Sequence, residues 1–332
     1  MHFALDLWYL AGIAFIIFSC NWHCALDAHV PRMVDPQRYQ GLLGGLQAPL
    51  IHWQASNALA AADDTLAHLR TLGVRIPPRC RLEQSRDAIR RVSQFNVQLG
   101  HGDSATERLY VEAHRTILES YLITRDLQPP TPETADRLRR MLGGPLVPTP
   151  GRHDPARDIQ AEFFAAVLLF GSGFRVYAEE PDLKLSQAGE EWPVAVKRVT
   201  SGRNFQKRMR EARDQLTRAQ RPGFIAVSAD QFLVERYERD READLSAIHY
   251  GQIAEWTDRL VLQPRNNSVV GVIGLCTSFR HIRGTPSAMN LTLHFHQRFI
   301  TWQEPALLRA AETSGAAMAD SLARMLERVF PG

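Results

Sequence analysis

The sequence has few cysteines, no long hydrophobic run and little net charge, and each absence argues against a class of protein. Its four cysteines follow no regular spacing, which argues against a disulfide framework and favours a reducing, cytoplasmic compartment. Cys20, His23 and Cys24 lie close together, but no second pair of ligands follows at the spacing of a zinc site. The net charge of +3 does not indicate a nucleic-acid partner by itself, so such a partner has to be argued from local clusters of basic residues.

The most apolar segment, residues 8–19, is too short to cross a bilayer, because a transmembrane helix needs about 20 apolar residues. No basic region precedes it, as a secretory signal would require. We therefore expect a buried helix or strand, or an extension upstream of the true start codon, rather than a membrane anchor. The sequence also lacks a glycine-rich phosphate loop of the Walker type, so it does not predict a nucleotide hydrolase.

The length of 332 residues favours two domains, and the hydrophobic fraction of 45% is ordinary for a soluble globular protein. Apolar residues at helical spacing predict helices over residues 49–72, 82–99 and 105–127. A stretch dense in proline and glycine, residues 143–151, marks the predicted domain boundary. We expect an all-helical domain over residues 1–150, available for self-association or a protein partner, and a second domain over residues 151–332.

The second half of the chain alternates helical and strand patterns, which is typical of an α/β fold with a mixed sheet. Helices are predicted over residues 155–170, 204–219, 230–258 and 304–330. Strands are predicted over residues 174–177, 192–199, 224–228, 268–277 and 288–301. His294 and His296 share one face of the last strand, a pattern of a metal pair or, more often, of a half-exposed strand.

Two charged residues interrupt these apolar patterns, and a third follows directly after a predicted strand. Glu162 lies in the apolar stripe of helix 155–170, where a carboxylate is costly unless it is paired, protonated or bound to a metal. A partly exposed position at the edge of the stripe fits the pattern equally well. Lys197 lies in a strand that is otherwise apolar, and its simplest compensation is an anionic partner. Asp182 follows the preceding strand, so this acid and the lysine can point into one cleft.

The run Pro181-Asp182, followed by a short hairpin and then Ala195-Val196-Lys197, resembles the PD-(D/E)XK nuclease superfamily. The resemblance implies a restriction-endonuclease-like fold, a mixed sheet flanked by helices, and covers about residues 157–230. It implies a nuclease that uses Mg²⁺ or Mn²⁺ to hydrolyse DNA, in a bacterial or phage-defence setting. Asp182 and the carbonyl of Val196 would hold the ion, and Lys197 would position the attacking water or neutralise the developing charge.

Two further residues fit the same resemblance. Glu162 lies where the superfamily carries an additional acidic residue, which can serve as a metal ligand. Gln215 stands in an Ala-x-x-Gln pattern near the end of helix 204–219, and in the resembling subgroup this glutamine faces the active site.

The sequence departs from the motif at Ala195, where the superfamily has Asp or Glu. Without this second carboxylate, metal affinity should fall and cleavage should be slow or absent. Three explanations stay open: Ala195 is an engineered substitution, the chain has become a nucleic-acid-binding or scaffold subunit without activity, or Glu162, Glu190 or Glu191 supplies the missing oxygen. An alternative Asp-x-Lys register, Asp182 to Lys184, lies in a shorter and more polar segment.

A run of basic residues around helix 204–219 favours a nucleic-acid partner, because such a density can follow a phosphate backbone. A solvated helix face is the common alternative for a charge run, but this run lies next to the predicted cleft. The predicted DNA-binding residues are Arg198, Arg203, Lys207, Arg208, Arg210 and Arg213.

Overall fold

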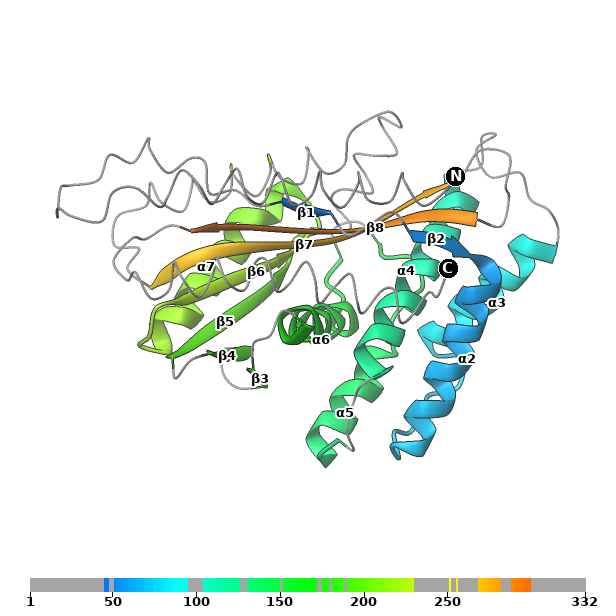
Figure 1. Ribbon diagram of the computed structural model, residues 1–332, viewed down its shortest axis with the longest axis horizontal. Helices are drawn as coiled ribbons and strands as arrows, with labels where there is room; N and C mark the ends of the chain where they lie inside the picture. The colour runs from blue at the N-terminus through cyan, green and yellow to red at the C-terminus, as the bar shows by residue number, and fades with distance from the viewer. Residues whose placement is uncertain are drawn as a thin grey trace, which may run out of the picture. The chain divides into compact units, whose positions relative to one another are not determined.

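In the computed structural model, residues 45–332 form one compact unit, and all of the residues described belong to it (Figure 1). The described residues are 45–47, 51–94, 104–125, 130–149, 152–171, 175–178, 181–187, 190–229, 251, 255, 268–281 and 288–299. Residues 8–24, most of the helix predicted over 230–258 and all of that over 304–330 lie outside them. For residues 288–299 only the backbone is described, so the side chains of His294 and His296 are also outside.

The described helices follow the apolar periodicity of the sequence closely. They are α2 (Ala55–Thr71), α3 (Arg81–Gln94), α4 (Ser104–Arg125), α5 (Pro132–Met141), α6 (Pro155–Gly171) and α7 (Gly202–Arg218). The start of α7 is fixed by a capping box between Ser201 and Asn204, each side chain accepting from the backbone of the other. None of the described helices is both long and apolar enough to cross a membrane.

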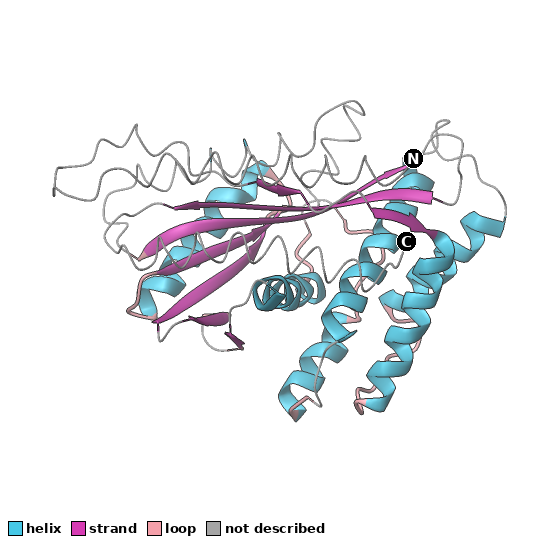
Figure 2. Cartoon of the chain, in the orientation of Figure 1, coloured by secondary structure: helices cyan, strands magenta, loops and turns pink. Residues whose placement is uncertain are grey.

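The described strands form one mixed sheet (Figure 2). They are β1 (Gly45–Gln47), β2 (Ile51–Gln54), β3 (Arg175–Tyr177), β4 (Leu183–Gln187), β5 (Glu190–Arg198), β6 (Gly223–Ser228), β7 (Val269–His281) and β8 (Ala288–Phe299). Their order is β1-β8-β7-β6-β5-β4-β3, and β2 also pairs with β8. The pairs β5–β6 and β6–β7 are parallel and the others antiparallel. The chain therefore has the α/β architecture that the sequence predicts.

Three strands, β1, β2 and β4, lie where no strand was predicted, and the first two fall in the part of the chain expected to be all-helical. The helix expected over residues 49–72 begins only at Ala55, because Ile51–Gln54 pairs antiparallel with β8 as strand β2. The segment after Asp182, where the sequence indicated only a short hairpin, contains β4, in which Leu183 and Leu185 alternate inward and are 4% and 1% exposed. Strand β4 pairs along its whole length with β5, and its partner β3 lies at the end of the sheet.

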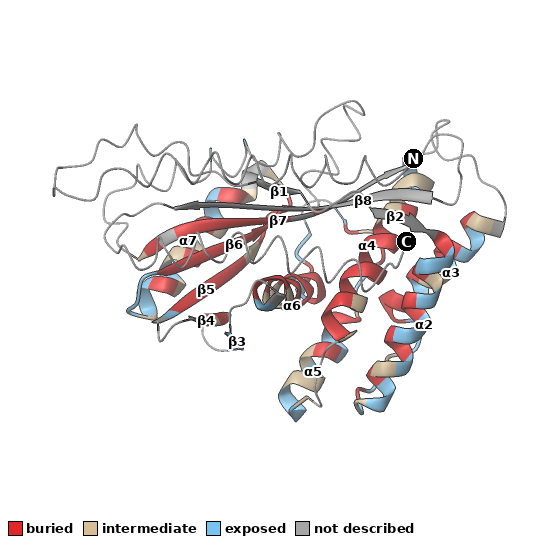
Figure 3. Ribbon diagram, viewed as in Figure 1, coloured by how far each residue is buried: buried red, intermediate tan, exposed pale blue. Residues whose placement is uncertain are grey.

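The central strands are buried on both faces (Figure 3). Even-numbered residues of β5 and β6, such as Val194 and Val196, belong to the same apolar core as α6. Odd-numbered residues, such as Ala195, belong to a second cluster with the apolar stripe of α7, which runs Phe205, Met209, Ala212 and Leu216. Helices α6 and α7 therefore cover opposite faces of the sheet.

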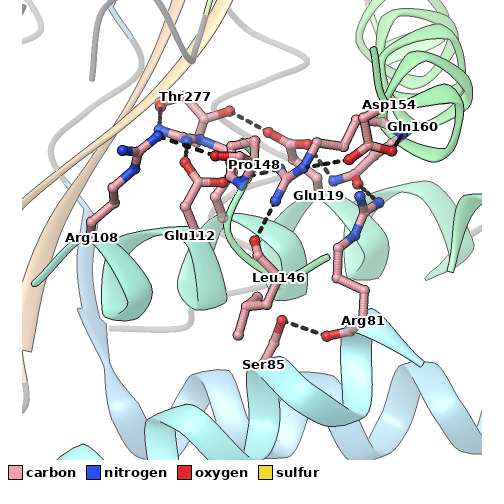
Figure 4. A network of polar contacts seen from close by, with 12 residues as sticks. Arg81, Ser85, Arg108, Glu112, Glu119, Leu146, Pro148, Asp154, Gln160 and Thr277 are labelled. Carbon is pink, nitrogen blue, oxygen red and sulfur yellow. Dashed lines mark hydrogen bonds and ion pairs between the residues drawn. The ribbon is translucent and has the colours of Figure 1, made fainter. Parts of the chain in front are cut away.

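The helices before residue 150 share a core with α6 and the sheet, so the packing shows no break at the predicted domain boundary. A buried polar network crosses this boundary (Figure 4). Gln160 of α6 donates to Glu119 of α4 at 2.5 Å, and the Thr277 hydroxyl of β7 donates to the same carboxylate at 3.2 Å. Arg157 of α6 pairs with Glu112 of α4 at 3.0 Å. A role of these helices in self-association stays a prediction.

Candidate functional site

Asp182 lies at the point where strands β4 and β5 separate. The β4–β5 ladder ends at the pair Leu183 and Val194, so the next inward N–H of β5, that of Val196, needs another acceptor. The Asp182 carboxylate supplies it, accepting this N–H at 2.7 Å through Oδ2. The Asp182 carboxylate thus occupies the place where a carbonyl of β4 would lie if the ladder continued. Its position is fixed because the β4–β5 pairing stops one residue after it.

Lys197 joins the same group of atoms. Its Nζ lies 3.1 Å from Asp182 Oδ2 and donates to the Val196 carbonyl oxygen at 2.9 Å. The two charged side chains are only 10% and 13% exposed, so each compensates for the burial of the other. The structure brings Lys197 to the acid and to the carbonyl named from the sequence.

Glu162 of α6 belongs to the same electrostatic environment. Burial and the Asp182 carboxylate raise the pKa of Glu162 to about 7, while Arg137 and Lys197 oppose the rise. Arg137 of α5 donates a hydrogen bond to the Glu162 carboxylate, and the two side chains are 23% and 19% exposed. Glu162 is therefore partly buried and paired with an arginine that the sequence did not single out.

Ala195 lies in a different environment from these groups. It is fully buried in the apolar cluster between β5 and α7, beside residues such as Phe205 and Met209. Among the acids that could replace a carboxylate here, Glu162 interacts electrostatically with Asp182. Glu191 is exposed and pairs instead with Lys184 and Arg221; the side chain of Glu190 lies outside the described part.

The oxygens at this site suit a hard divalent cation. Magnesium binds through one or two carboxylates, with water and substrate phosphate completing its ligands. Asp182 Oδ2 and the Val196 carbonyl oxygen both contact the Lys197 ammonium. One cation can therefore interact with both oxygens at the same time. Within the described residues no three or more His, Cys, Asp or Glu side chains are grouped to hold a metal ion. The donor set therefore fits an ion that depends on substrate oxygens for much of its coordination.

The basic residues divide into paired and exposed ones. Arg198 is 8% exposed and donates to Asp158 at 3.1 Å, and Arg208 lies between Asp158 and Glu211 at 3.4 and 3.1 Å. Both stabilise the fold and are poorly placed to contact a nucleic acid. Lys207 and Arg210 are exposed on α7.

The two remaining basic residues of the predicted set differ again. Arg213 is partly buried and lies 3.6 Å from Asp214. The side chain of Arg203 is not described.

A groove of about 440 Å³ opens beside the site, and Pro181, the residue before Asp182, lines it. Gln215 also lines this groove. Lys184, Arg218 and Arg221 lie there as well. The sequence analysis named Lys184 only in the alternative Asp-x-Lys register and did not single out the two arginines. The alternation in Leu183–Gln187 was the available signal for Lys184, because it indicates a strand beside β5.

Comparisons of the chain with models of known protein families, with curated proteins and with solved structures found no match.

Proposed function

We propose that this chain is a metal-dependent nuclease that hydrolyses DNA phosphodiester bonds at Glu162, Asp182 and Lys197. The observation that carries the proposal is the meeting of the Lys197 ammonium, the Asp182 carboxylate and the Val196 carbonyl, at 3.1 and 2.9 Å, within a partly buried site. The order of α6, the β3–β4–β5 strands, α7 and β6 also agrees with the restriction-endonuclease-like arrangement that the resemblance implies. The cytoplasm and phage defence are proposed on that resemblance.

Each side chain has a chemical role in this proposal. A bound Mg²⁺ or Mn²⁺ would make water a better nucleophile and stabilise charge on the phosphate. Asp182, the Val196 carbonyl and Glu162 are the oxygens that would hold the ion. Lys197 would neutralise charge that builds up on the phosphate in the transition state. Without an ion the pKa of Glu162 is raised to about 7, so protons compete with the ion for this carboxylate near neutral pH.

A cleavage assay on plasmid and linear DNA, with Mg²⁺ or Mn²⁺, tests this function. The chain as it stands should cut slowly, because one strand carboxylate is missing at Ala195. Lys197→Ala and Asp182→Asn should each lower the rate by about 100-fold or more. Arg139→Ala serves as the control, since this side chain is exposed on α5 and pairs only with Asp136 among the described residues. Undiminished cleavage by Lys197→Ala would refute the assignment of the site.

A second function is favoured by two observations: the Lys197 ammonium contacts both oxygens, and Ala195 is enclosed in apolar packing. These features suit a nucleic-acid-binding or scaffold subunit without activity. Ala195→Glu distinguishes the two functions. If Ala195→Glu cuts DNA and the double change with Lys197→Ala does not, the nuclease is supported. If both Ala195→Glu and the unchanged chain are inert while the unchanged chain binds DNA, the binding subunit is supported.

A further inference from the structure

The groove beside Asp182 carries an excess of positive charge. It lies between the start of β4, the start of β5 and the end of α7, where Lys184, Arg218 and Arg221 line it together with one acid, Glu191. Glu191 lies 3.5 Å from Lys184 and 3.1 Å from Arg221. The side chains of Arg218 and Arg221 are exposed to solvent. The single carboxylate of Glu191 therefore leaves the groove with a net positive charge. Such a groove attracts phosphate groups.

An aromatic side chain of β3 lies against Lys184, one of the basic residues that line the groove. Tyr177 is 45% exposed, which makes it one of the few large hydrophobic side chains on the described surface. It pairs across the strands with Lys184, whose Nζ lies 5.3 Å from the centre of the tyrosine ring. Basic side chains combined with an exposed aromatic ring are typical of sites where single-stranded nucleic acids stack their bases.

Gln215 adds a polar group that the fold does not use. Its Oε1 atom is buried and accepts no hydrogen bond within the described structure. A buried acceptor without a donor is costly, and a turn of this amide, which lines the groove, would bring the oxygen to a donor supplied by a ligand. The exposed edge of an unpaired base carries N–H donors, whereas base pairing uses these donors in a duplex.

We propose that this groove binds one unpaired nucleotide of a single-stranded DNA and leads its strand to the site at Asp182. The volume of about 440 Å³ lies within the range of pockets that hold a small organic ligand, about 300–1,000 Å³. Arg218, Arg221 and Lys184 contact phosphates, Tyr177 stacks on a base, and Gln215 Oε1 accepts a base N–H. This inference rests on the proposed nuclease function, because it names the form of DNA that the same site would receive.

Fluorescence anisotropy with a labelled deoxyoligonucleotide of about 12 nucleotides, in EDTA, measures this binding without cleavage. Arg218→Glu combined with Arg221→Glu should weaken binding by at least tenfold. It should also lower the slope of log affinity against log salt by about 1.4, or 0.7 for each lost phosphate contact. Arg139→Glu combined with Arg140→Glu is the matched control on the exposed face of α5, and it should change both quantities little.

Three further arms test the individual contacts. Tyr177→Ala should weaken binding about tenfold, and Tyr177→Phe should keep it, because stacking needs the ring and not the hydroxyl. Glu191→Gln should strengthen binding, since it releases Lys184 and Arg221 from their shared carboxylate. Tighter binding of the corresponding duplex or RNA would overturn the assignment to single-stranded DNA, as would equal losses in the α5 control.

The failure of this inference can be told apart from the failure of the nuclease proposal. Lys197→Ala should still bind the oligonucleotide in EDTA, because Lys197 does not line the groove. Binding that depends on the groove residues, with no cleavage by any variant, would leave the groove assignment standing and remove the nuclease. Cleavage of a single-stranded substrate that is lost in Lys197→Ala but unchanged in the groove variants would support the nuclease proposal and refute the groove assignment.

Discussion

Glu162 provides the sharpest test of the site, because its carboxyl group is expected to change charge near neutral pH. Burial and the Asp182 carboxylate favour its neutral form in the folded protein and raise its pKa from the ordinary 4.5 to about 7. In the unfolded chain the same group keeps its ordinary pKa. Between these two values folding is accompanied by proton uptake, so this group makes the protein less stable as the pH rises.

The expected size follows from the same pKa. A change from 4.5 to about 7 corresponds to about 3 kcal/mol once the carboxyl is ionised in both states. Linkage places about 2 kcal/mol of this change between about pH 5.5 and about pH 8. The substitution Glu162→Gln removes the titration and keeps an amide that can still meet Arg137. The stability of the unchanged protein relative to this variant should therefore fall by about 2 kcal/mol over that interval.

Urea unfolding of both proteins at the two pH values measures this difference. Glu133→Gln, at an exposed position on α5, is the matched control and should give a difference that does not vary with pH. A pH-independent difference for Glu162→Gln would refute the reasoning. It would mean that Arg137 holds the carboxylate ionised in the folded protein and outweighs the effect of burial.

Three other predictions concern the network, the sheet and the reaction. Arg157→Met leaves Glu112 buried without one of its partners, and urea unfolding should show a loss of about 3–5 kcal/mol. Gly223→Ala places a Cβ atom against the Pro193 carbonyl oxygen, so it should cost about 1–3 kcal/mol; an unchanged melting temperature would contradict this. If the nuclease proposal holds, cleavage at a subsaturating Mg²⁺ concentration should rise with pH through about 7 as Glu162 ionises, and the profile of Glu162→Gln should lose this rise.

The elements that position the site could be read from the sequence because burial leaves a periodic signal. Helix α6 was expected over 155–170 and spans Pro155–Gly171, and β6 was expected over 224–228 and spans Gly223–Ser228. Strand β2 was missed because it is only four residues long and its partner, β8, lies at the other end of the chain. Pairing between distant segments leaves little local trace, so a short edge strand followed directly by a helix reads as part of that helix.

The roles of individual charges were harder to predict than their existence. Glu162 and Lys197 stood out because each breaks an apolar pattern, and Asp182 because it follows a strand in the Pro-Asp run. Nothing in the sequence indicated that Arg198 and Arg208 would both pair with Asp158, since such contacts depend on where α6, β5 and α7 meet. A count of basic residues therefore overstated how much of this helix is free to bind DNA.

Helix α6 links the buried network to the candidate site. Arg157 and Gln160 tie it to α4, and Asp158 ties it to Arg198 at the end of β5, directly after Lys197. Glu162, one helical turn after Asp158, is thereby held near enough to Asp182 for the two carboxyl groups to interact electrostatically. Charge burial on this scale is a poor source of stability, because desolvation offsets most of the attraction. The buried ion pairs instead fix the position of α6. They thereby fix the distance between the Glu162 and Asp182 carboxylates, on which the binding of a shared cation would depend.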